Sequence, residues 1–305
     1  MKKIIVSICL LGFLFASRST SLAWSAAGHM EIAAIAYRDL SAANKTNVIE
    51  ILKHHPDCQK WKEAYAASLS DFDFDTFVFM RASTWPDEIR RKGNPYDHPL
   101  WHFIDYSLEP PTFPDKPSPY PTNDILFGIS QSEKFIKDTN STPEVRAAYL
   151  SWLIHLLGDI HQPLHCATLV NSNYLAPSGD KGGNDFFVKP ADAGVNLHSI
   201  WDKSLGATIN FRTELNYAIQ ISADHPRSSL TELAKDKTPV AWSKESRLIA
   251  IESGYLHGSL QGSTQADDAP ALPVGYTKNM KTIAERRAAL AGWRLADEIR
   301  NVVKP

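Results

Sequence analysis

The segment from residue 143 to residue 160 is an almost uninterrupted apolar stretch that contains two strongly polar side chains. It opens with Pro143 and Glu144, and its all-round hydrophobicity predicts a helix buried at the centre of a fold. His155 and Asp159 lie four residues apart, and therefore on one face of that helix. Burying a carboxylate is unfavourable unless it is paired or bound to a metal. The two side chains therefore either satisfy each other or bind a cation.

Histidine and aspartate recur in apolar surroundings elsewhere, and 11 His and 8 Trp are a large share of 305 residues. Eight side chains share this pattern: His29, His102, His155, His165, His198, Asp87, Asp159 and Asp202. Asp87 is expected at an apolar turn after Trp85-Pro86. Imidazole and carboxylate ligands without thiolate are typical of catalytic zinc sites. Eight candidates are too many for one tetrahedral zinc ion and suit two or three.

The rest of the chain predicts helices and few strands. Apolar residues at helical spacing predict further helices over residues 26–40, 41–52, 240–255 and 278–302. Residues 186–188 predict at most a short strand or hairpin arm. Six prolines between residues 110 and 121 resemble an inter-domain linker, but candidate ligands lie on both sides of them. We therefore expect one mainly α-helical domain in which this proline-dense segment is a surface excursion.

The first 23 residues have the pattern of a secretory signal peptide. Lys2 and Lys3 precede an apolar run, Ile4 to Phe15, that is too short to span a bilayer. Ser21-Leu22-Ala23 then offers the small residues that signal peptidase prefers. The alternative is a lone N-terminal membrane anchor. We expect cleavage after Ala23 and a secreted or periplasmic mature chain of residues 24–305.

Cleavage would change both the charge and the cysteine count. Removing Lys2, Lys3 and Arg18 from the 32 Lys and Arg residues leaves 29 basic against 34 acidic residues. The mature chain therefore lacks the basic excess that holds a nucleic-acid duplex by its phosphates, and any polyanion must meet a local positive charge. Cys58 and Cys166 remain after cleavage and allow one disulfide, which the sequence alone does not confirm.

Six motifs, in chain order, carry a resemblance to a known family. They are Trp24-Ser25-x-x-Gly28-His29, Asp87-x-x-Arg90, Trp101-His102-Phe103-Ile104-Asp105, His155-x-x-Gly158-Asp159-x-x-Gln162-Pro163-Leu164-His165, Gly182-Gly183-Asn184 and Asn196-Leu197-His198-x-x-Trp201-Asp202. Together they resemble the secreted zinc-dependent single-strand-specific nuclease and 3'-nucleotidase family, the S-one/P-one nuclease type. That family shares a superfamily with zinc-dependent phospholipase C. The resemblance implies a single, all-helical domain of this type over residues 24–305, with a trinuclear zinc cleft and a minor β-hairpin.

The resemblance also implies three zinc ions and assigns ligands to each. The first ion would be held by Asp87, His102, His155 and Asp159. The second would be held by His165, His198 and Asp202. The third would take His29, a shared oxygen of Asp159, and both the α-amine and the carbonyl oxygen of Trp24. Because only a chain cleaved after Ala23 offers that amine, cleavage would be an activation step.

The family's hydrolytic mechanism would then apply. A hydroxide shared by two zinc ions would attack phosphorus, because metal binding lowers the pKa of water toward about 7. The remaining zinc would stabilise the departing 3'-oxygen, and Arg90 would stabilise charge on the phosphoryl oxygens. Asp87, Arg90 and Asp159 are thus the predicted catalytic residues. Single-stranded DNA and RNA would yield 5'-phosphorylated nucleotides, and 3'-mononucleotides would lose their phosphate.

The resemblance places the nucleobase against three residues. Phe103 matches a stacking aromatic, an interaction worth about 1–3 kcal/mol per base. Asp105 and Asn184 match residues that hydrogen-bond the base edge, although Phe103 as plain core packing and no substrate role for Asp105 and Asn184 remain alternatives. A stacked duplex hides its base faces, which favours single strands as substrates. His161 matches no ligand position, and we expect it to support a ligand or to be exposed.

Two other functions remain open. A zinc-dependent phospholipase C would share the helical trizinc core, but Phe103, Asp105 and the Gly182-Gly183-Asn184 segment suit a nucleobase. A non-catalytic secreted zinc-binding protein would leave Arg90 without a purpose. No stable protein partner is implied, and we expect a monomer without a membrane anchor after cleavage.

Overall fold

The computed structural model describes residues 24–68, 73–90, 92–119, 122–207 and 209–304. Within these residues the chain is mainly helical, with two small two-stranded sheets, as the sequence predicts. The α-helices are α1 (Ala26–Asp39), α2 (Ala42–Leu52), α3 (Cys58–Ser68), α4 (Phe74–Ile89), α5 (Ile125–Lys137), α6 (Pro143–Asp159), α7 (Leu197–Asp202), α8 (Phe211–Asp224), α9 (Glu232–Lys235), α10 (Pro239–Ile249) and α11 (Tyr276–Val302). The predicted signal peptide, residues 1–23, lies outside the described residues.

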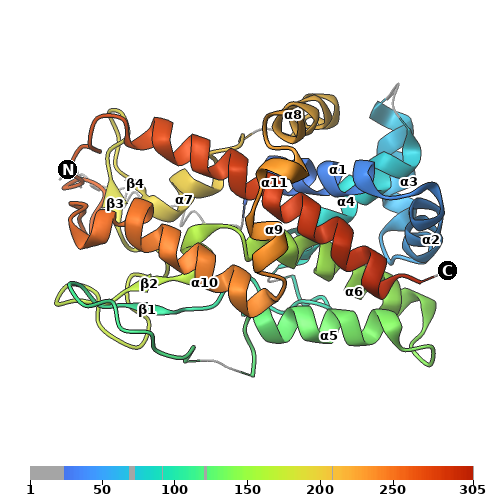
Figure 1. Ribbon diagram of the computed structural model, residues 1–305, viewed down its shortest axis with the longest axis horizontal. Helices are drawn as coiled ribbons and strands as arrows, with labels where there is room; N and C mark the ends of the chain where they lie inside the picture. The colour runs from blue at the N-terminus through green and yellow to red at the C-terminus, as the bar shows by residue number, and fades with distance from the viewer. Residues whose placement is uncertain (1–23, 69–72, 91, 120–121, 208, 305) are drawn as a thin grey trace, which may run out of the picture.

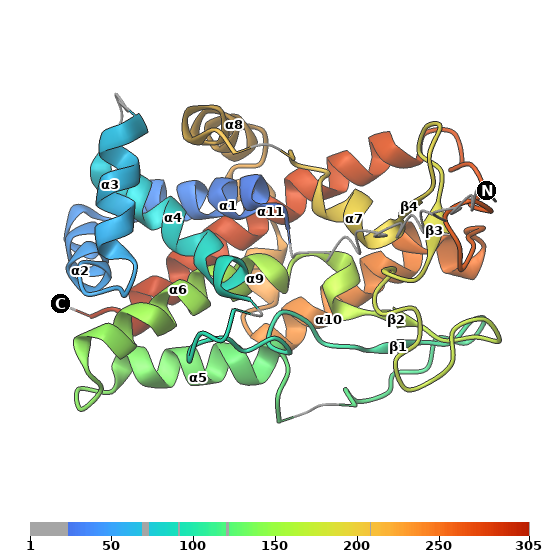
Figure 2. The same ribbon diagram turned by 180° about the vertical axis from the view of Figure 1, so that it is seen from behind.

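Helix α6 lies at the centre of the packing, where the sequence predicts a buried helix. Every residue of α6 from Leu150 to Asp159 is buried. α6 packs against α5 and α4, and α1 packs against α11, α4 and α8 (Figure 1). Helices α10 and α11 face the viewer in Figure 1, and α3 and α4 face the viewer in the opposite view (Figure 2). Polar side chains on α1, α4 and α6 can therefore meet inside the molecule.

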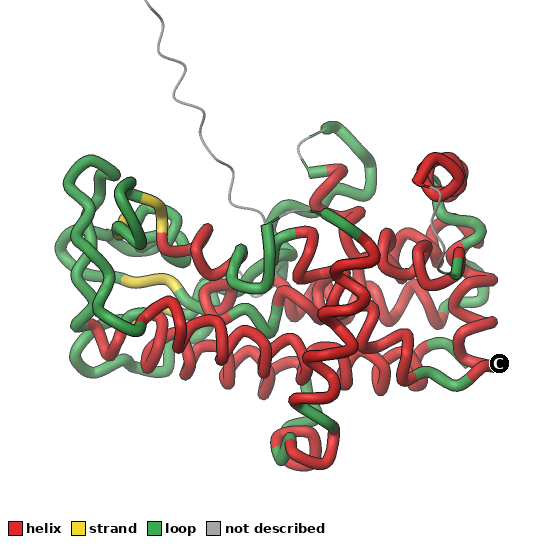
Figure 3. Tube along the Cα trace, turned by 90° about the horizontal axis from the view of Figure 1, so that it is seen from above, coloured by secondary structure: helices red, strands yellow, loops and turns green. Residues whose placement is uncertain are grey.

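The strands and many of the long loops gather at one end of the molecule (Figure 3). β3 (Phe187–Val188) pairs antiparallel with β4 (Val195–Asn196), which confirms the short strand predicted near residue 187. β1 (Ser107–Leu108) pairs in parallel with β2 (Thr168–Leu169), a pair that the sequence did not reveal. Strands of two residues are too short to show an alternating pattern. The β1–β2 pair joins the segment after His102 to the segment after His165.

Several helices begin at a residue whose side chain caps the first turn. The side chains of Ser25, Ser41 and Thr142 each accept a hydrogen bond from a backbone N–H in the first turn of α1, α2 and α6, respectively.

Two predicted element boundaries differ from the structure. The apolar turn expected at Asp87 is the last turn of α4, which continues through Pro86. The helix expected over residues 240–255 ends as an α-helix at Ile249 and continues as a π-helical turn, η3 (Ala250–Gly254).

The proline-dense segment lies against α10, as expected of a surface excursion, although its residues 120 and 121 lie outside the described residues. Arg247 of α10 donates hydrogen bonds to the carbonyl oxygens of Phe113 and Pro114, at 3.0 and 2.8 Å.

Cys58 and Cys166 do not form the disulfide that the sequence allows: both are free, buried cysteines. Among the described helices, none combines the length and the apolar composition needed to cross a membrane.

Candidate metal centre

All eight histidine and aspartate side chains singled out in the sequence come together in three groups. His29 comes from α1, Asp87 from the end of α4, and His155 and Asp159 from α6, while His198 and Asp202 come from α7. His102 lies in the loop before β1, and His165 lies in the 3₁₀ helix η1 (Pro163–Cys166). The groups whose ligand atoms lie within 4.8 Å of one another are His29, Asp87 and His155; His102, His155 and Asp159; and His165, His198 and Asp202. Each group could hold a metal ion.

Asp159 joins these groups because its two oxygen atoms face different imidazoles. Its Oδ2 lies 3.0 Å from His155 Nε2 and 3.1 Å from His102 Nδ1. Its Oδ1 lies 3.3 Å from His29 Nε2 and 3.6 Å from His165 Nδ1. The Asp159 side chain has no exposed surface. A carboxylate in this position can be shared between two metal ions, one on each oxygen.

The group around His102 and His155 has the spacing of metal ligands. His102 Nδ1 and His155 Nε2 are 2.9 Å apart, and Asp87 Oδ1 lies 3.8 and 4.0 Å from them. Nitrogens bound to one tetrahedral zinc at about 2.0–2.1 Å lie roughly 3.3 Å apart. His155 Nδ1 donates to the carbonyl oxygen of Ser83 at 2.8 Å, so its Nε2 is the nitrogen free to accept a metal.

The group on α7 and η1 is oriented in the same way. The Nε2 atoms of His165 and His198 are 3.1 Å apart, and Asp202 oxygens lie 3.7 and 3.5 Å from them. His165 Nδ1 donates to the carbonyl oxygen of His102 at 2.7 Å, and His198 Nδ1 donates to that of Gly182 at 2.6 Å. Both Nε2 lone pairs therefore point into the group, as a metal ligand requires.

The beginning of the described chain lies beside His29. Trp24 is fully buried, and its indole N–H donates to the carbonyl oxygen of Gly158 at 3.0 Å. The backbone N–H of Ser25 donates to the carbonyl oxygen of Asp202 at 2.9 Å. Gly158 allows α6 to approach α1, because a Cβ atom at this position would lie 2.8 Å from His29 Nδ1. These contacts fix Trp24 between α6 and α7.

Burial and neighbouring charges shift the pKa values of these groups in different directions. Burial lowers the pKa of His29 to about 4 and that of His102 to about 3, which keeps both imidazoles neutral and able to bind metal. Burial raises the pKa of Asp87 to about 6. For Asp159 the neighbouring imidazoles outweigh burial and hold its pKa well below the usual range. The carboxylates of Asp159 and Asp87 likewise outweigh burial at His155 and raise its pKa to about 9. The buried negative charge therefore attracts a cation.

The predicted substrate residues lie on segments next to these groups. Arg90 caps α4 three residues after Asp87. Its positive charge lowers the pKa of Asp87, against the effect of burial, and it lowers the pKa of His102 together with burial. Phe103 and Asp105 follow His102, and both are partly buried. The carbonyl oxygen of Phe103 accepts a hydrogen bond from the backbone N–H of Ile125 at 3.0 Å, which ties this segment to the start of α5. Burial raises the pKa of Asp105 to about 7.

Asn184, the fourth predicted substrate residue, follows the Gly182-Gly183 pair. Its side-chain amide donates to the carbonyl oxygen of Lys181 at 2.9 Å. The backbone N–H of His198 donates to the carbonyl oxygen of Gly183 at 3.3 Å, so the turn that carries Asn184 adjoins the α7 group. The contacts that Arg90, Phe103, Asp105 and Asn184 would make with a substrate stay predictions.

His161 is fully buried, so the expectation that it could be exposed is wrong. Its Nδ1 donates to the carbonyl oxygen of Leu157 at 2.8 Å, and its Nε2 accepts from Arg294 at 2.9 Å. Both ring nitrogens are therefore used, and His161 supports the turn after Asp159. Arg287 and Arg294 both bind Glu245, at 2.7 and 2.6 Å. Sequence reasoning missed this cluster, although two arginines seven residues apart on an apolar helix were a readable signal.

Gln162 is a second residue to which sequence reasoning gave no role. Its side-chain amide donates to Asp202 Oδ1 at 2.7 Å, while its carbonyl oxygen accepts from the backbone N–H of Leu164 at 2.6 Å. Gln162 therefore orients the carboxylate of a candidate ligand. The signal in the sequence was a polar residue in an apolar run between two candidate ligands.

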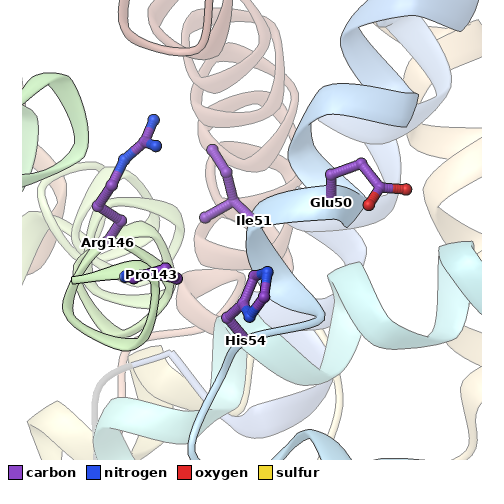
Figure 4. A pocket seen from close by; sticks show the side chains of 5 residues that line it. All are labelled: Glu50, Ile51, His54, Pro143 and Arg146. Carbon is purple, nitrogen blue, oxygen red and sulfur yellow. The ribbon is translucent and has the colours of Figure 1, made fainter. Parts of the chain in front are cut away.

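A pocket lies beside the first residue of α6 (Figure 4). It is lined by Glu50, Ile51, His54, Pro143 and Arg146. Pro143 is the first residue of α6, and His155 follows twelve residues later. Because an α-helix rises about 1.5 Å per residue, this separation is roughly 18 Å. The pocket therefore takes no part in the candidate metal centre.

Comparison with known proteins identifies the family. The S1/P1 Nuclease family model matches residues 24–304. Endonuclease 4 of Arabidopsis thaliana is 28% identical over 166 residues, a match that spans half of this chain and half of that protein. Endonuclease 3 of Arabidopsis thaliana is 24% identical over 311 residues, which cover 92% of this chain and 90% of that protein. Nuclease P1 of Penicillium citrinum is 24% identical over 303 residues, which cover 92% and 97% of the two chains. Since the family model spans nearly all of the described residues, the chain belongs to the S1/P1 nuclease family.

Proposed function

We propose that this protein is a secreted, zinc-dependent phosphodiesterase that cleaves single-stranded DNA and RNA to 5'-phosphorylated nucleotides. We also propose that it removes the phosphate of 3'-mononucleotides. Membership of a nuclease family supports a hydrolase that acts on phosphodiester bonds. The observation that carries the proposal is the junction of three metal-capable groups at the single carboxylate of Asp159.

Zinc fits the donor atoms of these groups. The donors are imidazole nitrogens and carboxylate oxygens, as in catalytic zinc sites, and no cysteine is among them. Several of these side chains have buried atoms without a hydrogen-bond partner among the described residues: the imidazole nitrogens of His29, Asp87 Oδ1 and Asp159 Oδ1. Buried polar atoms without partners are costly, so a bound ion would stabilise them.

We assign the ligands to three ions. The first would be held by Asp87, His102, His155 and Asp159, and the second by His165, His198 and Asp202. The third would be held by His29, Asp159, and the α-amine and carbonyl oxygen of Trp24. Support for the third assignment comes from the buried position of Trp24 next to Gly158. The free amine would arise by cleavage of residues 1–23 during export.

Bound zinc supplies a water with a pKa near 7 and positive charge at the phosphate and the leaving 3'-oxygen. The chain's own residues hold this chemistry in place. The carbonyl oxygens of Ser83, His102 and Gly182 fix the imidazoles of three ligands by accepting a hydrogen bond from the Nδ1–H of each ring. Arg90, next to Asp87, would bind the phosphoryl oxygens and stabilise their developing charge.

The nucleobase would be bound by the segment after His102 and by the turn at Asn184. Phe103 would stack on the base, and Asp105 and Asn184 would hydrogen-bond its edge. A base inside a duplex has no free face for this stacking, which is why single strands are the proposed substrates. The acidic chain needs no basic surface for this purpose, because the metal ions supply the local positive charge.

A panel of substrates tests the proposal on purified residues 24–305. We expect hydrolysis of single-stranded DNA, single-stranded RNA and 3'-AMP, much slower cleavage of duplex DNA, and loss of activity after chelation of zinc. Hydrolysis of phosphatidylcholine alone would identify a phospholipase C instead. Zinc binding without hydrolysis of any member of the panel would show a non-catalytic zinc-binding protein.

A further inference from the structure

Asp180 is a fully buried carboxylate that the proposed metal centre does not use. Its Oδ2 accepts a hydrogen bond from the Tyr255 hydroxyl at 2.6 Å, and its Oδ1 accepts one from the backbone N–H of Leu169 at 2.8 Å. Burial raises its pKa to about 6 in spite of these bonds. Placing a carboxylate here is costly, so its contacts call for a functional reason.

Asp180 closes the turn that carries Asn184. Its carboxylate accepts a hydrogen bond from the backbone of Gly183, which opposes the effect of burial on its pKa. The backbone N–H of Asp185 donates to the carbonyl oxygen of Asp180 at 3.0 Å. Gly182 has a φ of +63° in this turn, and a Cβ atom there would lie 2.5 Å from the carbonyl oxygen of Leu164. The turn is therefore tightly packed, and Asp180 is its buried anchor.

The same carboxylate is tied to the segment that carries the other proposed base contact. Its charge adds to burial in raising the pKa of Asp105. Leu169, which donates to Asp180, pairs in β2 with Leu108 of β1, the strand that follows Asp105. Asp180 thus links the segment of Asp105 to the turn of Asn184.

We propose that Asp180 is a positioning residue for the nucleobase subsite. Held by Tyr255 and Leu169, it fixes the turn in the position from which Asn184 reaches the base edge. It acts through this turn, without touching the substrate or a metal ion. The inference rests on the proposed function, since it assumes that Asn184 contacts a nucleobase.

Asp180→Asn and Tyr255→Phe test the inference through substrates with and without a base. An amide in place of the Asp180 carboxylate has only one acceptor oxygen and cannot accept both hydrogen bonds, and Phe lacks the hydroxyl that donates one of them. We expect each variant to raise the KM for 3'-AMP by roughly tenfold, the scale of one lost charged hydrogen bond. The KM for ribose 3-phosphate should stay unchanged, because that substrate has no base. Zinc content is measured alongside it, because the same turn carries the Gly182 carbonyl that orients His198. A loss of zinc in these variants would overturn the inference.

Asp185→Asn is the matched control. Asp185 belongs to the same turn, but its side chain is exposed and pairs with Lys181 on the surface at 2.7 Å. This variant should leave both KM values unchanged. Equal increases in KM for the two substrates, or no increase for 3'-AMP, would overturn the inference.

Amide hydrogen exchange separates failure of this inference from failure of the proposed function. Asp180→Asn should speed exchange at Leu169 and across residues 181–185 without speeding exchange in α6. Unchanged exchange in this turn would overturn the positioning role, whatever the activity. A wild-type protein that hydrolyses neither substrate would instead refute the proposed function.

Discussion

Asp159 is the residue on which the candidate centre depends. Its side chain has no exposed surface, and four imidazoles lie within 3.6 Å of its two oxygen atoms. Hydrogen bonds to Asp159 do not account for all four rings, because His165 Nδ1 already donates to the carbonyl oxygen of His102. Asp159 Oδ1 and both ring nitrogens of His29 also have no hydrogen-bond partner among the described residues. The arrangement is chemically consistent when cations lie between the carboxylate and the rings. A single residue therefore sets where the three groups meet.

Glu31 is a second buried carboxyl, and its effect on stability is testable. It is fully buried in α1, and neither of its oxygens has a hydrogen-bond partner among the described residues. Burial, followed by the nearby Glu214, raises its pKa well above the usual value of 4.5. Below pH 4.5 the group is protonated in both the folded and the unfolded chain, so it has no effect. As the pH rises, only the unfolded chain ionises, and stability falls by about 1.4 kcal/mol per pH unit until the folded pKa is reached.

Glu31→Gln should therefore raise the melting temperature at pH 8 and change it little at pH 4. Residues two apart lie on different faces of a helix, so the substitution should spare His29. Thermal unfolding at the two pH values is the measurement, with exposed Glu50→Gln as the control. A loss of stability at pH 8 that exceeds the loss at pH 4 would contradict this account.

At the scale of elements, the sequence predicted those helices whose signals are local. Helix α6 is apolar on every side, and α1, α2 and α6 begin at clear capping residues. Helix α4 was missed because a proline inside a helix normally breaks it. Pro86 is tolerated because it lies near the end of α4, with only three helical residues after it. The β1–β2 pair was missed because it joins residues about sixty positions apart. Its existence depends on the packing around His102 and His165, which no local pattern reports.

One carboxylate links α10 to α11. Glu245 of α10 binds Arg287 and Arg294 of α11, whose side chains are both 3% exposed. These hydrogen bonds and charges outweigh burial and lower the pKa of Glu245. Glu245→Gln would leave two buried guanidinium groups uncompensated, so we expect a loss of about 3–5 kcal/mol in the free energy of unfolding.

Denaturant unfolding at neutral pH measures this loss, and exposed Glu252→Gln is its control. Since the pKa of Glu245 is depressed, its contribution is present above about pH 4.5 and is lost as the pH falls through the folded pKa. The two variants should therefore differ most at neutral pH and converge in acid. An unfolding free energy of the Glu245 variant equal to that of the Glu252 variant at neutral pH would refute the structural role.

At the scale of the whole molecule, the sequence predicted the candidate ligands better than their surroundings. The eight imidazole and carboxylate residues could be named because polar groups in apolar helices need partners, and the structure brings all eight together. The carbonyl oxygens of Ser83 and Gly182, which orient His155 and His198, could not be named. Any residue has a carbonyl group, so only the folded chain shows which one accepts a given N–H.

We propose that three zinc ions lie around Asp159 in the mature chain. Anomalous diffraction at the zinc absorption edge, from crystals of residues 24–305 grown with zinc, would locate them. We expect three peaks: one between His102 and His155, one among His165, His198 and Asp202, and one beside His29 and the amine of Trp24. A single peak, or peaks away from Asp159, would contradict it.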